Sequence, residues 1–270
     1  MKTTDGKWFI FPEPIPQAEL RLFCFPYAGG GASAFRSWPN YLPGQVEVCA
    51  VQLPGRENRL KDSPFTRLEP LVQAFMEVLP PYLDLPFALF GHSLGAAAAF
   101  ELARQLRREY DLTSVCLFAS ARVAPQLPNR ESPVYRLSDA ALIDRLRHFN
   151  GTPDCILQDA QLMRSLLPLL RADFEVNETY VCTPDEPLNC PIFAFRGSKD
   201  EIMTYDEVAA WREQTNSLFT LRTIPGDHFF IHNAKELFLQ ILAYDLRQLL
   251  HKLDKEASAH LGVLNSKEGQ

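Results

Sequence analysis

The sequence predicts an α/β fold in which helices cover both faces of a mainly parallel sheet. Three observations indicate this class. Short apolar runs, typical of buried strands, alternate along the chain with longer segments of helical periodicity. Hydrophobic residues make up 46% and charged residues 22% of the sequence, which is ordinary usage for a globular protein. With 270 residues the chain is long enough for one large domain with a substantial core, so we expect a single domain over residues 1–270.

The individual elements follow in chain order from these runs. Strands are predicted where an apolar run ends at turn residues, at 20–25, 46–51, 87–90, 114–119, 191–195 and 219–224. Helices are predicted at 68–79, where two prolines end the periodic pattern, and at 94–109, 206–214 and 234–251. The polar tail, residues 254–270, is expected to be flexible.

The alternation of strands and helices is interrupted between residues 122 and 187. Residues 138–148 are amphipathic, with Ser138 as a candidate N-cap and Gly151 just beyond the end. The segment 161–170 is strongly apolar, and 172–180 is compatible with a further helical piece. We therefore predict a helical insertion that forms a lid over the functional site, with Leu166, Leu167 and Leu170 as candidates for its apolar underside. Extra packing at the side of the sheet is the alternative.

The most informative short motif is G-H-S-L-G at residues 91–95. It follows the apolar run 86–90 and precedes four alanines at 96–99, so its context is strand, tight turn, helix. This context predicts a nucleophile elbow, in which a strained turn exposes the Ser93 hydroxyl and glycines stand where side chains would not fit. The start of the following helix supplies free N–H groups where an oxyanion would form. An incidental serine in a glycine-bounded turn is the alternative.

A serine hydroxyl becomes a good nucleophile when a histidine accepts its proton and a carboxylate orients that histidine. Behind a nucleophile elbow the three residues follow in the order serine, carboxylate, histidine. His228 lies in the loop after the strand at 219–224, where the base is expected. Asp200 follows the strand at 191–195 and is the predicted carboxylate, with Glu201 and Asp206 as weaker candidates. A turn-forming carboxylate is the alternative for Asp200.

Other titratable residues near these positions fit the chemistry less well. Asp227 is adjacent to His228 and cannot easily face its ring, while His92 is adjacent to Ser93 and its side chain should point away. His228 and His232 have the spacing of a zinc-binding pair, but Phe229 stands where H-E-x-x-H requires glutamate. No metal site is therefore expected.

The loop after the first predicted strand reads F-P-Y-A-G-G-G-A at residues 25–32. Three consecutive glycines let a backbone approach a ligand closely. Phosphate binding is not indicated, because no Lys-Ser/Thr follows and G-x-G-x-x-G is absent. We predict that the N–H of Ala28 in this loop and the N–H of Leu94 after the nucleophile form an oxyanion hole. A merely flexible loop is the alternative.

Charge and cysteine usage exclude several classes of function. The net charge of −6 and the lack of a basic run argue against a nucleic-acid-binding protein. The basic clusters at 56–67 and 104–108 are interpreted as solvated surface charge. The polar start of the chain has no leader pattern, and no apolar run reaches the roughly 18 residues of a membrane span. Six cysteines without metal-ligand spacing indicate a reduced, cytoplasmic protein, in which Cys24, Cys49 and Cys116 are buried.

Five segments occur together in one order: F-P-Y-A-G-G-G-A at 25–32, Q-L-P-G-R-E at 52–57, F-G-H-S-L-G-A at 90–96, R-A-D at 171–173 and G-D-H-F-F at 226–230. From about residue 18 to 250 the chain resembles the type II thioesterases that serve nonribosomal peptide and polyketide synthetases. The resemblance implies an α/β-hydrolase fold with a helical lid. It places the family triad on Ser93, Asp200 and His228 and the oxyanion donors on Ala28 and Leu94.

This resemblance also implies a substrate and a partner. Type II thioesterases hydrolyse acyl thioesters from the phosphopantetheine arm of carrier proteins and so clear stalled or misprimed synthetases. We accordingly expect a cytoplasmic monomer that binds acyl or peptidyl carrier proteins, needs no cofactor and contacts neither nucleic acid nor membrane. Tyr27, Gly29 and Phe229, which flank the predicted donor and base, are candidate substrate-binding residues.

Two other functions remain open from the sequence. A small-molecule esterase or lipase of the same fold would use the same triad, because a general serine–histidine–aspartate site also cleaves oxygen esters. A non-catalytic binding module of this fold is the other, and the complete set of three catalytic residues argues against it.

Overall fold

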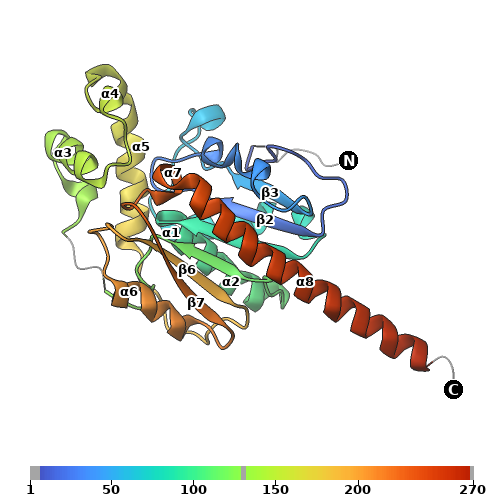
Figure 1. Ribbon diagram of the computed structural model, residues 1–270. Helices are drawn as coiled ribbons and strands as arrows, with labels where there is room; N and C mark the ends of the chain where they lie inside the picture. The colour runs from blue at the N-terminus through green and yellow to red at the C-terminus, as the bar shows by residue number, and fades with distance from the viewer. Residues whose placement is uncertain (1–6, 129–131, 268–270) are drawn as a thin grey trace.

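Figure 1 shows the computed structural model of the chain, which describes residues 7–128 and 132–267. The start of the chain, where no leader is expected, residues 129–131 of the predicted insertion, and residues 268–270 of the predicted tail lie outside the described residues.

Seven strands form one sheet in the order β1-β3-β2-β4-β5-β6-β7. Their bounds are Phe9–Ile10, Leu20–Phe25, Val46–Val51, Phe87–His92, Leu117–Ser120, Ile192–Gly197 and Phe219–Ile224, from β1 to β7. All neighbouring strands are parallel except β1, which pairs antiparallel with β3. The mainly parallel sheet confirms the predicted fold class. The sequence did not predict β1, because two residues are too few to show a period.

Helices cover both faces of this sheet (Figure 1). Helices α1 (Leu68–Val78) and α2 (Leu94–Tyr110) pack on one face and against each other. The long helix α8 (Lys235–Lys267) crosses the other face, where Phe90 of β4 contacts Phe238 with ring centroids 5.9 Å apart. The short helices α6 (Tyr205–Ala209) and α7 (Phe230–Asn233) follow β6 and β7.

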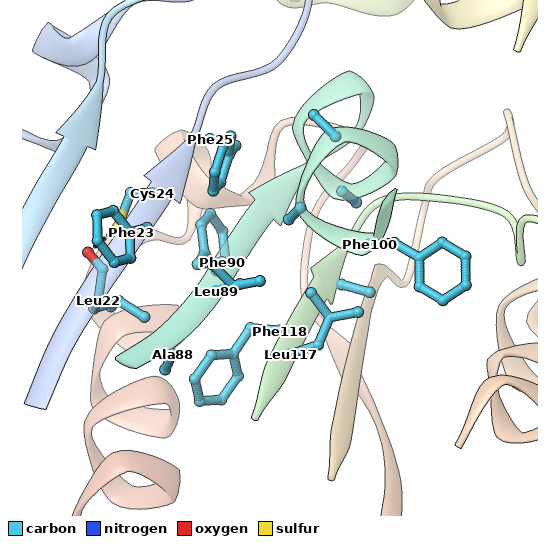
Figure 2. Close-up of a cluster of buried hydrophobic side chains, with 14 of the residues drawn as sticks. Leu22, Phe23, Cys24, Phe25, Ala88, Leu89, Phe90, Phe100, Leu117 and Phe118 are labelled. Carbon is cyan, nitrogen blue, oxygen red and sulfur yellow. Dashed lines mark hydrogen bonds between the residues drawn. The ribbon is translucent and has the colours of Figure 1, made fainter. Parts of the chain in front are cut away.

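The core is built from the central strands, whose residues in β2, β3, β4 and β5 are all buried. Figure 2 shows the side chains of β2 and β4 lying side by side, with Phe25 and Phe90 near the ends of their strands. Phe25 packs edge-on against Phe75 of α1, whereas Phe90 faces α8, so the two faces of the sheet are filled separately. Burial of each such ring contributes roughly 1.5–3 kcal/mol. The three cysteines predicted to be buried are buried and unpaired.

The predicted insertion contains α3 (Asp139–Phe149), α4 (Asp154–Leu157) and α5 (Ala160–Thr179), which stand together at one end of the sheet (Figure 1). As predicted, Ser138 caps α3, and its Oγ accepts a hydrogen bond from the Ala141 N–H. The C-cap of α3 is Asn150 in the left-handed region, one residue before the predicted Gly151. The two helical pieces predicted at 161–170 and 172–180 form one helix. The insertion has a hydrophobic cluster of its own, which comprises Val134, Leu142, Leu146, Leu157, Met163, Leu167 and Leu170.

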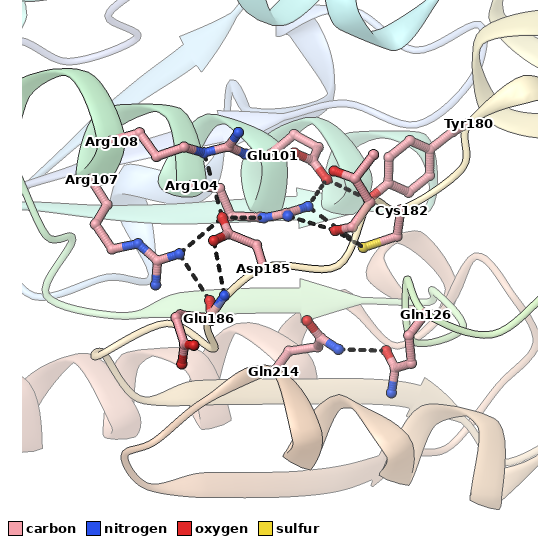
Figure 3. A network of polar contacts seen from close by, with 11 residues as sticks. Glu101, Arg104, Arg107, Arg108, Gln126, Tyr180, Cys182, Asp185, Glu186 and Gln214 are labelled. Carbon is pink, nitrogen blue, oxygen red and sulfur yellow. Dashed lines mark hydrogen bonds and ion pairs between the residues drawn. The ribbon is translucent and has the colours of Figure 1, made fainter.

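The interpretation of the arginine clusters as solvated charge is wrong for three of their members. Arg56, Arg59 and Arg104 are only 4%, 8% and 2% exposed, and each forms an ion pair. Figure 3 shows Arg104 of α2 between Glu101 and Asp185, at 2.6 and 3.2 Å. The ion pair with Asp185 holds the segment between α5 and β6 against α2, the helix that follows Ser93. A charge pattern cannot reveal burial of this kind, because Asp185, one of the ion-pair partners of Arg104, lies 81 residues away in the sequence.

The C-terminal region differs from the expected boundary. The sequence predicts that the last helix ends at residue 251 before a flexible tail, whereas α8 continues to Lys267. Residues 252–267 contain no proline and one glycine, and most of the others are good helix formers, which explains the continuation. Among residues 7–128 and 132–267 no helix is long and apolar enough to cross a membrane.

Candidate active site

Ser93 lies in the turn between β4 and α2, in the predicted strand–turn–helix context. Its φ of 54° and ψ of −114° fall outside the regions that most residues adopt, so the turn is strained. Gly91 and Gly95, two residues before and after Ser93, lie so close to other backbone atoms that neither position has room for a side chain. A Cβ on Gly91 would lie 2.1 Å from the carbonyl oxygen of Gly95, and a Cβ on Gly95 would lie 2.1 Å from that of Phe25.

Asp200 and His228 follow β6 and β7 and meet at the carboxyl edge of the sheet. Their side chains are hydrogen-bonded, with 2.8 Å between His228 Nδ1 and Asp200 Oδ2, and both residues are buried. The Ile202 N–H holds the other carboxylate oxygen at 3.0 Å. Because an ionised carboxylate only accepts, Nδ1 carries the proton and Nε2 of a neutral His228 has a free lone pair. The weaker candidates, Glu201 and Asp206, are exposed, and within the described chain neither contacts His228.

Ser93 and His228 line one cavity of about 390 Å³. The structure thus joins Asp200 to His228 by a hydrogen bond and places Ser93 and His228 on one cavity, although the three residues lie in three different loops. A nucleophile, a base and an orienting carboxylate beside a cavity can carry out acyl transfer.

The residue before the nucleophile, His92, is buried and turned away from the cavity, as the sequence predicts. Its Nδ1 lies 2.9 Å from Ser120 Oγ and its Nε2 lies 3.0 Å from the backbone carbonyl of His228. Burial, and then the nearby imidazoles of His228 and His232, hold the pKa of His92 well below its usual value. His92 is therefore a neutral structural contact between the nucleophile turn and the loop that carries His228.

The two backbone groups predicted to bind an oxyanion have no acceptor within the described residues. The Leu94 N–H belongs to the first turn of α2, where helical N–H groups have no intrahelical partner. Ala28 lines the cavity together with Ser93, and the N–H of Ala28 makes no hydrogen bond to the described chain. Both donors are therefore available to a ligand.

Of the three candidate substrate-binding residues, Tyr27 and Phe229 line the cavity, and their rings meet edge to face at 5.1 Å. The Tyr27 hydroxyl lies 2.8 Å from His232 Nε2, so the second histidine of the rejected zinc pair contacts a tyrosine. The Gly29 N–H donates instead to Asp173 Oδ2 at 2.7 Å. No cluster of three possible metal ligands occurs in the part of the chain that the structure describes.

The insertion supplies one wall of the cavity. Its apolar lining residues include Val134, Leu146, Phe149, Leu170 and Phe174. Of the three leucines expected on its underside, Leu170 lines the cavity, whereas Leu166 and Leu167 pack within the insertion. Asn150 Nδ2 donates to Asp227 Oδ2 at 2.8 Å, which joins the end of α3 to the loop of His228. Asp227 thus bonds to the insertion, and among the described residues no hydrogen bond joins its carboxylate to the His228 ring, in agreement with the expectation that it cannot easily face that ring.

Comparisons with known proteins show the family to which the chain is similar. A family model described as "Thioesterase domain" matches residues 20–246. The chain is 47% identical over 245 residues to gramicidin S biosynthesis protein GrsT of Aneurinibacillus migulanus, covering 91% of this chain and 96% of that one. It is 37% identical over 235 residues to thioesterase PikA5 of Streptomyces venezuelae, covering 86% and 83%.

Among solved structures, the chain is likewise similar to thioesterases. The thioesterase RedJ from the prodiginine pathway of Streptomyces coelicolor is similar with a TM-score of 0.80 at 41% identity, over 84% of this chain and 90% of that one. The type II thioesterase BorB from the borrelidin cluster has a TM-score of 0.80 at 36% identity, over 91% and 98%.

Proposed function

The chain belongs to the thioesterase family of α/β-hydrolase fold, and from that premise we propose that it hydrolyses acyl and aminoacyl thioesters on the phosphopantetheine arm of carrier proteins. Its role is that of a type II, editing thioesterase of nonribosomal peptide or polyketide biosynthesis. Support comes from relatives and solved structures of similar length that are named for such pathways. The six cysteines, none of them paired, support a cytoplasmic location.

The observation that carries the proposal is that Ser93 and His228 line one cavity while Asp200 is hydrogen-bonded to His228. Ser93 Oγ attacks the thioester carbonyl while His228 Nε2 accepts its proton. The N–H groups of Ala28 and Leu94 bind the oxyanion, a contribution of about 3 kcal/mol for each donor in comparable sites. Asp200 keeps Nδ1 protonated and stabilises the imidazolium that forms.

The first half of the reaction ends when the carbon–sulfur bond breaks. His228 returns its proton to the departing thiol, which stays on the phosphopantetheine arm, and the acyl group remains as an ester on Ser93. A water then loses a proton to His228 and attacks this ester. The bond between Ser93 Oγ and the acyl carbon breaks, His228 returns the proton to Oγ, and the acid is released. Both half-reactions use the same base and oxyanion donors, so no metal or cofactor enters either step.

Mass spectrometry of acylated carrier proteins tests this function directly. Acetyl- and aminoacyl-phosphopantetheinyl carrier proteins are incubated with the enzyme and with Ser93→Ala, and loss of the acyl mass is followed. We expect deacylation by the wild type alone. Faster hydrolysis of an oxygen ester with the same acyl group would favour a general esterase, and failure of a fluorophosphonate to label Ser93 would favour a binding module.

A further inference from the structure

The loop at 27–32, which carries the predicted donor Ala28, has three of its six N–H groups occupied by contacts within the described protein. The Gly30 N–H donates to the Tyr27 carbonyl at 2.9 Å, and the Ala32 N–H donates to Gln52 Oε1 at 2.8 Å. The Gly29 N–H donates to Asp173 at 2.7 Å. Ala28 lines the cavity, and its N–H makes no hydrogen bond to the described chain, so the direction of this N–H depends on how the neighbouring residues are held.

Asp173 and Arg56 hold the part of this loop that follows Ala28. Both Nη atoms of Arg56 donate hydrogen bonds to Asp173, Nη1 to Oδ2 at 2.7 Å and Nη2 to Oδ1 at 2.8 Å. Arg56 Nη1 also donates to the carbonyl of Gly30 at 2.9 Å. The pair of Arg56 and Asp173 therefore holds the N–H of Gly29, which is the residue after Ala28, and the carbonyl of Gly30 one residue further on.

This pair is buried, and it joins segments that are far apart in the sequence. Asp173 is 3% exposed and Arg56 is 4% exposed, so solvent screens their attraction little. Asp173 lies on α5, the long helix of the insertion, and Arg56 lies after β3. The loop at 27–32 is thus held against α5, the helix whose Leu170 forms part of the cavity wall.

The backbone next to Ala28 lies close against α5. Gly29 has a φ of 78°, and a Cβ there would lie 2.7 Å from Leu170 Cδ2. The loop therefore lies directly against α5 with its backbone in the left-handed region. Loss of the Asp173 contact would free the Gly29 N–H and allow the peptide groups around Ala28 to turn.

We propose that Asp173 and Arg56 are positioning residues that aim the Ala28 N–H at the oxyanion. This inference rests on the proposed function, because it requires that the oxyanion forms beside Ser93. Neither residue touches the acyl group in this proposal, and both act through the backbone of Gly29 and Gly30. Their loss should weaken transition-state binding more than substrate binding.

The alternative is an ion pair that only stabilises the fold. Two ligands separate these roles. A trifluoromethyl ketone analogue of acetyl-pantetheine is attacked by Ser93 and carries the oxyanion, whereas the matching thioether has no carbonyl and cannot form one. A structural defect alone would weaken the binding of both ligands by the same factor.

The test compares Asp173→Asn with Glu175→Gln. Glu175 lies on the same helix and pairs with Arg67 at the surface, so its substitution also removes an ion pair of α5. Asp173→Asn leaves the Arg56 charge buried without a partner and can impair folding. The double variant Arg56→Gln with Asp173→Asn removes both charges and provides a second, better balanced variant. Melting temperatures identify the folded variants.

For Asp173→Asn, or for the double variant, we expect a roughly 10- to 100-fold fall in kcat and a similar loss of ketone affinity. KM and thioether affinity should stay within threefold, and Glu175→Gln should change none of these values. Ketone and thioether affinities that fall together, or a kcat equal to that of Glu175→Gln, would overturn the positioning role. Ketone binding needs no carrier protein, so it tests this inference even if the wild type fails to deacylate carriers.

Discussion

His92 Nε2 lies 3.0 Å from the backbone carbonyl of His228, so the residue before the nucleophile holds the loop of the predicted base. A carbonyl only accepts, and this bond therefore places the proton of His92 on Nε2. In the neutral ring Nδ1 must then accept the hydroxyl proton of Ser120, 2.9 Å away. Both ring nitrogens are satisfied in the uncharged ring, which agrees with the direction in which its pKa is shifted.

This arrangement predicts an acid-sensitive stability. The pKa of His92 is lowered in the folded state, so below about pH 6.5 the unfolded chain binds a proton that the folded chain does not. The stability that His92 confers is present above this pH and is lost as the pH falls. Burial lowers the pKa of His232 as well, with the same sign. The free energy of unfolding in urea should therefore decrease from pH 7.5 to 5 in the wild type. In His92→Gln the slope should be smaller by up to about 1.4 kcal/mol per pH unit, and equal slopes would contradict this assignment.

Substitution of Ser93 should separate chemistry from stability. Ser93→Ala removes the nucleophilic oxygen but keeps a Cβ at a φ of 54°, so turnover should be lost while the melting temperature changes little. Ser93→Gly should also be inactive yet more stable, by about 0.5–1 kcal/mol, because glycine adopts positive φ without strain. Rates on an acetyl thioester and thermal unfolding of both variants measure this. Activity of Ser93→Ala within tenfold of the wild type would refute the role of Ser93.

Asp200→Asn should lower kcat by roughly 10³- to 10⁴-fold. An amide can donate to Nδ1 and so favours the wrong tautomer of His228, even though its shape is nearly unchanged. Glu201→Gln and Asp206→Asn serve as matched controls, because both carboxylates are exposed and close in sequence. The assignment is wrong if Asp200→Asn is mild and either control is severe.

Local patterns were sufficient for the elements that position the site. The turn at Ser93 and the loops of Asp200 and His228 each follow an apolar strand, and chain order alone assigned their roles. Local patterns did not predict the buried pair of Arg56 and Asp173, because the two residues are 117 positions apart and their burial depends on tertiary contact. An arginine among other charged residues has the same local pattern whether it is solvated or buried.

The insertion shows the same limit for apolar residues. Helical periodicity places Leu166, Leu167 and Leu170 on one helix, but it cannot tell which of them faces a cavity and which faces α3 or α4. The strand predicted at 114–119 begins later, at Leu117, because the β5 ladder pairs with β6 only from Ile192 onward. Its boundary was set by the neighbouring strand and not by its own apolar run.

The wall residue Leu170 should influence acyl-chain preference. Shortening it to alanine enlarges the cavity beside Ser93 and removes a contact with Gly29 in the loop at 27–32. We expect the ratio of kcat/KM for octanoyl over acetyl thioesters to rise about tenfold, a typical effect of a change of this size in an apolar pocket. Leu162→Ala is the control, since Leu162 lies on the same helix but is 40% exposed.

If the insertion is a lid, it must also open more readily than the sheet. Its helices pack mainly on their own small cluster, so amide hydrogen exchange in α3 and α4 should be faster than in β4. Exchange in α5 near Asp173 should be slower than in α3, because the pair with Arg56 fastens that turn to the body of the domain. Uniform protection of α3 and β4, together with an unchanged chain-length ratio in Leu170→Ala, would show that the insertion is ordinary packing at the side of the sheet.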